Sequence, residues 1–128
     1  MSAALPQHRS IGGPLIDGLS LYDNLLIEQT LGEAGLRPAL LDEFQAWMSQ
    51  AGCPVDLDTW RHRSVAEATP LEVMQARVGR AWLGDPQALS VEPSAWDDAV
   101  WPFDRLDQAF RQRHPWRTLS RAVLPTVS

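Results

Sequence analysis

The stretch from Thr69 to Gly84 constrains the fold most, because its start, its end and its apolar face are all specified. Thr69 is a good N-cap, Pro70 suits the first helical position, and Glu72 can complete a capping box. Gly84 and the following Asp85-Pro86 are typical of a helix end. We therefore predict a helix between Thr69 and Gly84. Its apolar residues recur at helical spacing: Leu71, Met74, Val78, Ala81 and Trp82.

Gly79 is the one residue of this stretch that disfavours a helix, since an interior glycine costs about 1 kcal/mol relative to alanine. We interpret Gly79 as an isolated glycine that the helix tolerates without a structural reason. The alternative is a close crossing with another helix, where a β-carbon would clash.

The rest of the chain also favours helices. No segment shows convincing alternation of apolar and polar residues together with an enrichment in β-branched residues, so we expect no strands. We therefore predict an all-α fold, a small single-domain helical bundle with four longer helices and two or three short helical turns. Residues 1–19 are expected to form an irregular N-terminal arm, and residues 20–128 a single helical domain. Beyond the central helix, the expected helices are Leu21 to Ala34, Pro38 to Gln50, Asp56 to Arg63, a turn capped by Ser94, Phe103 to Arg113, and Trp116 to Leu124.

Length and composition describe an ordinary soluble domain. The 128 residues suffice for one domain with a core, and no apolar run is long enough to cross a membrane. No secretory signal is visible, and Cys53 is the only cysteine, so we expect a cytoplasmic protein. All eleven basic residues are arginine, which suggests a bacterial genome of high GC content.

Charge is distributed unevenly along the chain. Residues 1–102 carry fourteen acidic residues and six arginines, a net charge of −8, whereas residues 103–128 carry two acidic residues and five arginines, a net charge of +3. An acidic body argues against general binding to nucleic acid, which needs clustered positive charge. Only the basic C-terminal third offers such a cluster.

No motif predicts catalysis, a metal site or a cofactor. The histidines are isolated, and Gly12-Gly13 lacks the further glycines and the lysine of a phosphate-binding loop. Asp56-Leu57-Asp58 resembles carboxylate pairs that hold a divalent cation, but we interpret one of these residues as the cap of a short helix. Asp97 and Asp98 are interpreted as charges that complement a helix dipole. We expect no catalytic residues, no bound metal and no cofactor.

Six tryptophans are the most unusual feature of the composition. Trp47 and Trp82 lie in strong apolar stripes, so we assign them to the core. Trp96, Trp101 and Trp116 fall in short segments interrupted by proline, where complete burial is harder. Tryptophan and arginine dominate binding hot spots, so we predict a partner surface in the C-terminal third. Its expected residues are Trp101, Arg105, Arg111, Arg113, Trp116, Arg117 and Arg121; the alternative is a packed face opposite a solvated arginine face.

These features favour a non-enzymatic bacterial accessory or adaptor protein that binds a protein partner, including a second copy of itself, through that surface. One alternative is a small enzyme or enzyme subunit with a pocket lined by tryptophan and by Asp56, Asp58, Asp97 and Asp98. A further alternative is a regulator that contacts nucleic acid through the arginines from Arg111 to Arg121.

Overall fold

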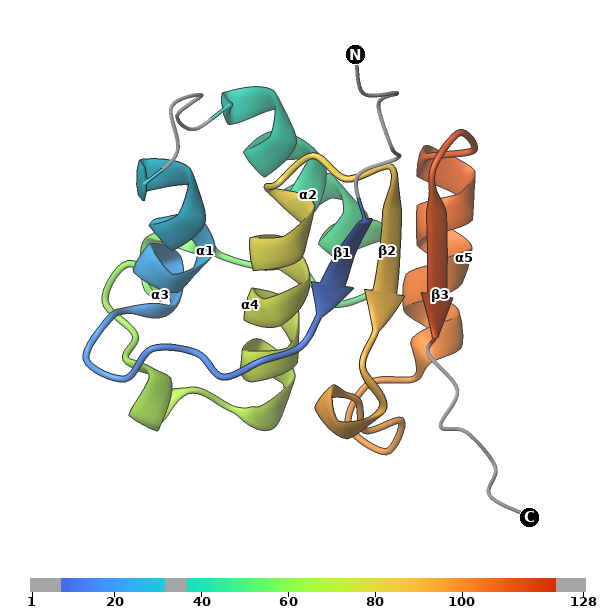
Figure 1. Cartoon of the computed structure of the whole chain (residues 1–128). Coiled ribbons are helices and arrows are strands. Elements are labelled where there is room, and N and C mark those ends of the chain that lie inside the picture. The colour runs from blue at the N-terminus through green and yellow to red at the C-terminus, as the bar shows by residue number, and fades with distance from the viewer. Residues whose placement is uncertain (1–7, 32–36, 122–128) are drawn as a thin grey trace.

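A three-stranded parallel sheet organises the chain in the computed structural model, which describes residues 8–31 and 37–121. The strands are β1 (His8–Ile11), β2 (Ala88–Val91) and β3 (Thr118–Arg121), and they lie in the order β1-β2-β3. Figure 1 shows them side by side, with all three arrows pointing the same way. The fold is therefore α/β, and the prediction of an all-α helical bundle is wrong.

Helices make up most of the remaining structure. They are α1 (Leu21–Leu31), α2 (Pro38–Gln50), α3 (Leu57–Trp60), α4 (Pro70–Trp82) and α5 (Phe103–Arg113), with short 3₁₀ helices η1 (Val65–Glu67) and η2 (Pro93–Ala95). The bounds of α2 and α5 agree with the predicted ones. No helix within residues 8–31 and 37–121 is both long and apolar enough to cross a bilayer.

Two sequence predictions fail where the strands lie. Residues 8–11, within the segment expected to be an irregular arm, form β1. The last predicted helix, Trp116 to Leu124, is wrong because its residues 118–121 form β3, in register with β2. Residues 122–124 of that predicted helix, and residues 32–34 of the first one, lie outside the described residues.

Helix α4 begins and packs as its sequence predicts. The Thr69 hydroxyl accepts a hydrogen bond from the Glu72 amide at 3.1 Å, and the Glu72 carboxylate accepts one from the Thr69 amide at 2.9 Å. The predicted capping box is therefore confirmed. Met74, Val78, Ala81 and Trp82 are all buried, and α4 packs against both α1 and β1.

Gly79 lies where α4 crosses its neighbours, so our interpretation of simple tolerance is wrong. A β-carbon at this position would lie 2.5 Å from the Leu25 side chain and 2.8 Å from the Phe44 ring. Both neighbours are fully buried. The missing side chain is what lets α4 approach α1 and α2 this closely.

The two faces of the sheet differ in chemistry. On one face, Ile11, Leu89, Val91 and Leu119 are buried. On the other, one row runs across all three strands in register as Ser10, Ser90 and Ser120, with the Ser90 side chain 2.7 Å from the His8 ring nitrogen. Ser10 and Ser120 are exposed and Ser90 is half-buried, so this second face is polar and open in the described part of the chain.

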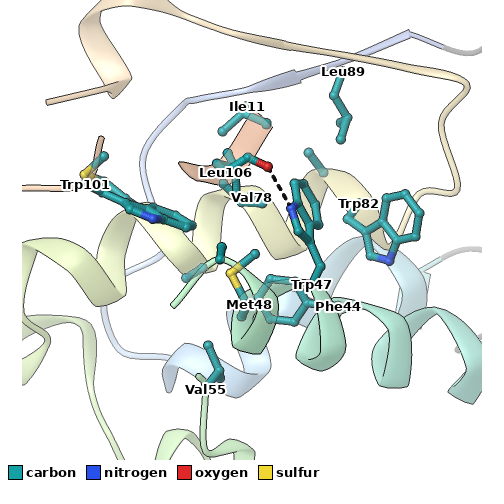
Figure 2. Close-up of a cluster of buried hydrophobic side chains, with 14 of the residues drawn as sticks. Ile11, Phe44, Trp47, Met48, Val55, Val78, Trp82, Leu89, Trp101 and Leu106 are labelled. Atoms are coloured by element: carbon teal, nitrogen blue, oxygen red, sulfur yellow. Dashed lines mark hydrogen bonds between the residues drawn. The ribbon is translucent and has the colours of Figure 1, made fainter. Parts of the chain in front are cut away.

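A cluster of large aromatic rings joins three helices beneath the buried face. Trp47 of α2 lies 5.8 Å from Trp82 of α4 and 4.9 Å from Phe110 of α5, between ring centroids. The Trp47 indole also donates a hydrogen bond of 3.1 Å to the carbonyl of Leu106, drawn as a dashed line in Figure 2. The assignment of Trp47 and Trp82 to the core is therefore confirmed. Trp96 and Trp101 are also buried, contrary to our expectation.

Replacing Gly79 with alanine tests the close crossing. Overpacking in a core costs about 1–3 kcal/mol, and the gain in helix propensity returns about 1 kcal/mol, so we expect Gly79→Ala to lower the free energy of unfolding by up to about 2 kcal/mol. Urea denaturation measures this change. The pair Gln108→Gly and Gln108→Ala, at an exposed position of α5, reports helix propensity alone. A Gly79→Ala protein more stable than wild type would contradict the steric explanation.

Candidate functional site

The carboxyl ends of the three strands meet at one edge of the sheet, because the strands are parallel. In open α/β sheets this edge is where ligands usually bind. β1 continues into Gly12-Gly13, β2 continues into Glu92-Pro93, and β3 ends at Arg121. Neither the glycine pair nor Glu92 was predicted as a site residue, because only the order of the strands brings them together.

Glu92 lies directly against the turn that follows β1. Its amide donates a hydrogen bond of 3.0 Å to the carbonyl of Ile11. A β-carbon at residue 12 would collide with the Glu92 carboxylate as it lies here, so the absence of a side chain at Gly12 lets this carboxylate pack against the turn. Gly13 adopts a φ of 78°, which glycine tolerates best. Glu92 is exposed, and no ion pair involves its carboxylate within the described ranges.

Arg80 of α4 holds the same turn from the helix side. Its guanidinium donates hydrogen bonds to the carbonyl oxygens of Gly12 at 2.8 Å and Pro14 at 2.9 Å, and a longer one to that of Gly13 at 3.3 Å. These contacts satisfy three consecutive carbonyls of a turn that has no regular hydrogen-bonded structure. The backbone beside Glu92 is therefore held in place by α4.

A second carboxylate near this edge is already engaged. Asp98 forms an ion pair of 2.6 Å with Arg121 and accepts a hydrogen bond of 3.1 Å from the amide of Phe103. The Arg121 hydrogen bond, together with that from Phe103, holds the pKa of Asp98 below its usual range. The Arg121 guanidinium also lies 5.6 Å from the centre of the Phe103 ring. Asp98 and Arg121 therefore connect the end of β3 to the start of α5.

The edge does not by itself fit a magnesium nucleotide. Phosphate-binding loops use a G-x-x-x-x-G-K-[S/T] sequence, and this chain contains no lysine. No group of three or more metal-binding side chains occurs in the described part of the chain. Asp56, considered above as a metal ligand, instead caps α3 by accepting from the Asp58 amide at 3.1 Å, and Asp58 lies 3.8 Å from Arg61. What the edge offers is one exposed carboxylate on a fixed turn.

The predicted partner residues occupy several different environments. Trp101 is 3% exposed and Trp116 is 90% exposed. Arg105 is exposed, and Arg111 is paired with Asp107 at 3.1 Å. These side chains therefore include both a core residue and residues in solvent.

Arg117 is engaged with the body of the protein. It pairs with Asp85 at 2.8 Å, donates to the Pro86 carbonyl at 2.6 Å and lies 4.8 Å from the centre of the Trp82 ring. Burial raises the pKa of Asp85, but the hydrogen bonds and charges of Arg117 and Arg37 outweigh it, and this pKa lies below its usual range.

Arg113, the last residue of α5, is also engaged with the body of the protein. It forms a fork of hydrogen bonds with Glu43 of α2, at 2.7 Å from both Nε and Nη2, and donates to Gln50 at 2.9 Å. This hydrogen bonding lowers the pKa of Glu43, whereas partial burial of the carboxyl opposes that shift. The Arg113 side chain therefore ties α5 to α2.

Comparison with known proteins identifies the fold. No protein-family model matches the sequence, and no curated protein matches it significantly. Solved structures do match. One is an ATP-binding cassette protein, dimeric in a post-hydrolysis state with ADP and phosphate bound, with a TM-score of 0.63 and 9% identity over 94% of this chain and 53% of its own. Another is a bacterial ABC exporter of the Atm1 family with ATP bound, with a TM-score of 0.60 and 15% identity over 92% of this chain and 21% of its own.

The chain thus spans about half the length of the first neighbour and about a fifth of the second. At these identities the likeness shows the fold. Both neighbours are ATP-binding cassette proteins with nucleotide bound, so the prediction of a non-enzymatic accessory or adaptor protein is wrong.

Replacing Arg80 with glutamine tests how the turn beside Glu92 is held. The change removes charge-assisted hydrogen bonds to the carbonyls of Gly12 and Pro14, and we expect the free energy of unfolding to fall by about 1–2 kcal/mol. Hydrogen exchange at the Glu92 amide should also become faster. The matched control is Arg111→Gln, which removes one exposed ion pair worth about 0.5 kcal/mol or less. Equal effects of the two substitutions would contradict the proposed role of Arg80.

Replacing Glu43 with glutamine tests the ion pair between α2 and α5. The pKa of Glu43 is lower in the folded protein than its usual value of 4.5, so its stabilising effect is full above that value and is lost as the pH falls through the folded pKa. At neutral pH we expect Glu43→Gln to be less stable by about 1–2 kcal/mol, and the difference to close in acid. Urea denaturation across the pH range measures it, with Asp107→Asn as control. A difference independent of pH would refute the assignment.

Proposed function

We propose that this chain is a nucleotide-binding segment of an ATP-binding cassette ATPase, and that it contributes the carboxyl edge of its sheet to the nucleotide site. The observation that carries the proposal is the match of 94% of the chain to a cassette ATPase structure with ADP and phosphate bound. The proposal includes assembly with a second polypeptide, since that neighbour is described as a dimer. It also places this assembly in the cytoplasm.

Glu92 is the residue of this edge best suited to nucleotide chemistry. It follows the central strand, its carboxylate is exposed, and its backbone is tied to the end of β1. In enzymes that hydrolyse nucleotides, a positioned side chain orients the attacking water, and metal ions neutralise charge on the phosphates. A carboxylate can accept a proton from water or bind such a metal ion through water. Glu92 has the position and the chemistry for either task.

The phosphates need a partner that this sequence does not supply. A lysine and a glycine-rich loop normally cradle them, and the chain has no lysine, so a second copy would not provide one either. In the proposal the phosphate-binding loop therefore belongs to polypeptide outside these 128 residues. The chain alone is expected to bind nucleotide weakly, with a dissociation constant on the order of 1 mM, about −4 kcal/mol.

Nuclear magnetic resonance with ATP and Mg²⁺ tests this proposal. We expect millimolar MgATP to shift the backbone amides of Gly12, Gly13 and Glu92, and to leave that of Gly52 in place. Because carboxylate and triphosphate repel each other, the wild-type protein should need Mg²⁺ for binding, and Glu92→Gln should bind ATP with a weaker dependence on Mg²⁺. Glu67→Gln is the matched control, since Glu67 is exposed and lies in η1. Shifts that avoid this edge, or no shifts at millimolar MgATP, would overturn the proposal.

A further inference from the structure

A cavity of about 280 Å³ lies between α4 and the turn that follows β2. Val73, Met74 and Arg77 line it from α4, and Ser94, Trp96 and Val100 line it from the turn. Its volume is just below the usual range for small-molecule pockets, about 300–1,000 Å³, so it suits a small ligand. None of Gly12, Arg80 and Glu92 contributes to its walls, which makes it separate from the carboxyl edge of the sheet.

The deeper wall of this cavity is apolar and held in place. Trp96 is 8% exposed and Met74 is 5% exposed. The Trp96 indole donates a hydrogen bond of 2.9 Å to the Trp101 carbonyl, and the two indole rings stack with centroids 5.0 Å apart. With its polar atom satisfied and one ring face covered, Trp96 presents apolar surface without rearrangement.

Arg77 places a positive charge at this apolar wall, and no described residue forms an ion pair with it. Its side chain is half-buried, and its Nε is buried without a hydrogen-bond partner among the described residues. Two other arginines do have partners: Arg80 of α4 donates to backbone carbonyls, and Arg63 lies 3.4 Å from Glu72. A charged group that is partly buried without a partner is costly, so a ligand that accepts hydrogen bonds from the accessible part of the Arg77 guanidinium gains affinity.

The charges around the cavity favour a monoanion over a phosphate. Arg77 is the one positively charged lining residue among the described residues, and exposed Asp97 at the opposite side carries a negative charge that would repel a dianion. Asp97 accepts a hydrogen bond of 2.9 Å from the Ala99 amide and forms no ion pair with Arg77. A single carboxylate matches one guanidinium through a fork of two hydrogen bonds. We propose that this cavity binds a small apolar carboxylate, with Arg77 as the residue that pairs with it.

Methyl groups of methionine report on this site directly. The chain has three methionines; Met74 lines the cavity, and Met48 lies in the core with no exposed surface. In protein labelled with ¹³C at the methionine methyl groups, titration with phenylacetate should shift the Met74 signal saturably and leave the Met48 signal in place. Benzyl alcohol, which has the ring without the charge, should bind at least about tenfold more weakly.

Substitutions separate the role of Arg77 from general charge. Arg77→Gln should weaken phenylacetate binding by about tenfold or more, because it removes the charge-assisted hydrogen bonds. Arg105→Gln removes the same charge from an exposed residue outside this cavity, and should leave the affinity unchanged. Val73→Phe fills the cavity and should abolish binding with Arg77 still present. Circular dichroism and thermal unfolding confirm that each variant is folded before it is scored.

A peptide separates the two sources of such a carboxylate. The peptide is Gly-Gly-Phe with a free C-terminus. If it binds more tightly than phenylacetate, the ligand is the end of a polypeptide; if phenylacetate binds more tightly, the ligand is a free acid. Amidation of the peptide should remove its binding in either case. The proposal is overturned if phenylacetate leaves Met74 unshifted, if benzyl alcohol binds equally well, or if Arg77→Gln binds phenylacetate as wild type does.

Discussion

The contact of Trp47 with Trp82 and Phe110 fixes how the three main helices lie beneath the sheet. Each ring comes from a different helix, and each is at most 1% exposed. The indole N–H groups also fix the orientation of the rings, since Trp47 donates to the carbonyl of Leu106 in α5 and Trp82 donates to that of Leu40 in α2. Because α4 leads into β2 and α5 leads into β3, the positions of these helices also determine where the strands begin. The edge that carries Glu92 depends on that arrangement.

The open face of the sheet explains why this α/β fold is hard to find in the sequence. Parallel strands are usually buried on both faces and then consist of nearly continuous apolar residues. Here Ser10, Ser90 and Ser120 occupy one face, and each strand is only four residues long, with the sequences HRSI, ALSV and TLSR. Such short segments, with neither a continuous apolar run nor sustained alternation, do not distinguish a strand from a helix end. The pairing itself joins residues as distant as His8 and Ala88, which no local pattern reveals.

Helices were predictable where local chemistry defines them. Thr69 and Glu72 satisfy the first amides of α4, and Pro38 opens α2 at the position that the sequence indicates. Local chemistry did not resolve Gly79, whose role depends on Leu25 and Phe44, residues far away in the sequence. Glu92 was missed for a similar reason, since the turn at Gly12 that it lies against and the Arg80 side chain that holds this turn come from other elements. Caps and periodicity are properties of one segment, whereas this crossing and this edge are properties of several.

The charges at the carboxyl edge indicate which parts of a nucleotide site this chain can supply and which have to come from another molecule. Arg80 places its guanidinium against three backbone carbonyls, and Arg121 is paired with Asp98. These two positive charges are therefore used to hold the turn after β1 and the end of β3. A triphosphate brought to this edge meets an exposed carboxylate, and the cations that neutralise it have to arrive with the nucleotide or from another polypeptide. On this reasoning the edge contributes a positioned carboxylate, and affinity for phosphate is supplied from outside.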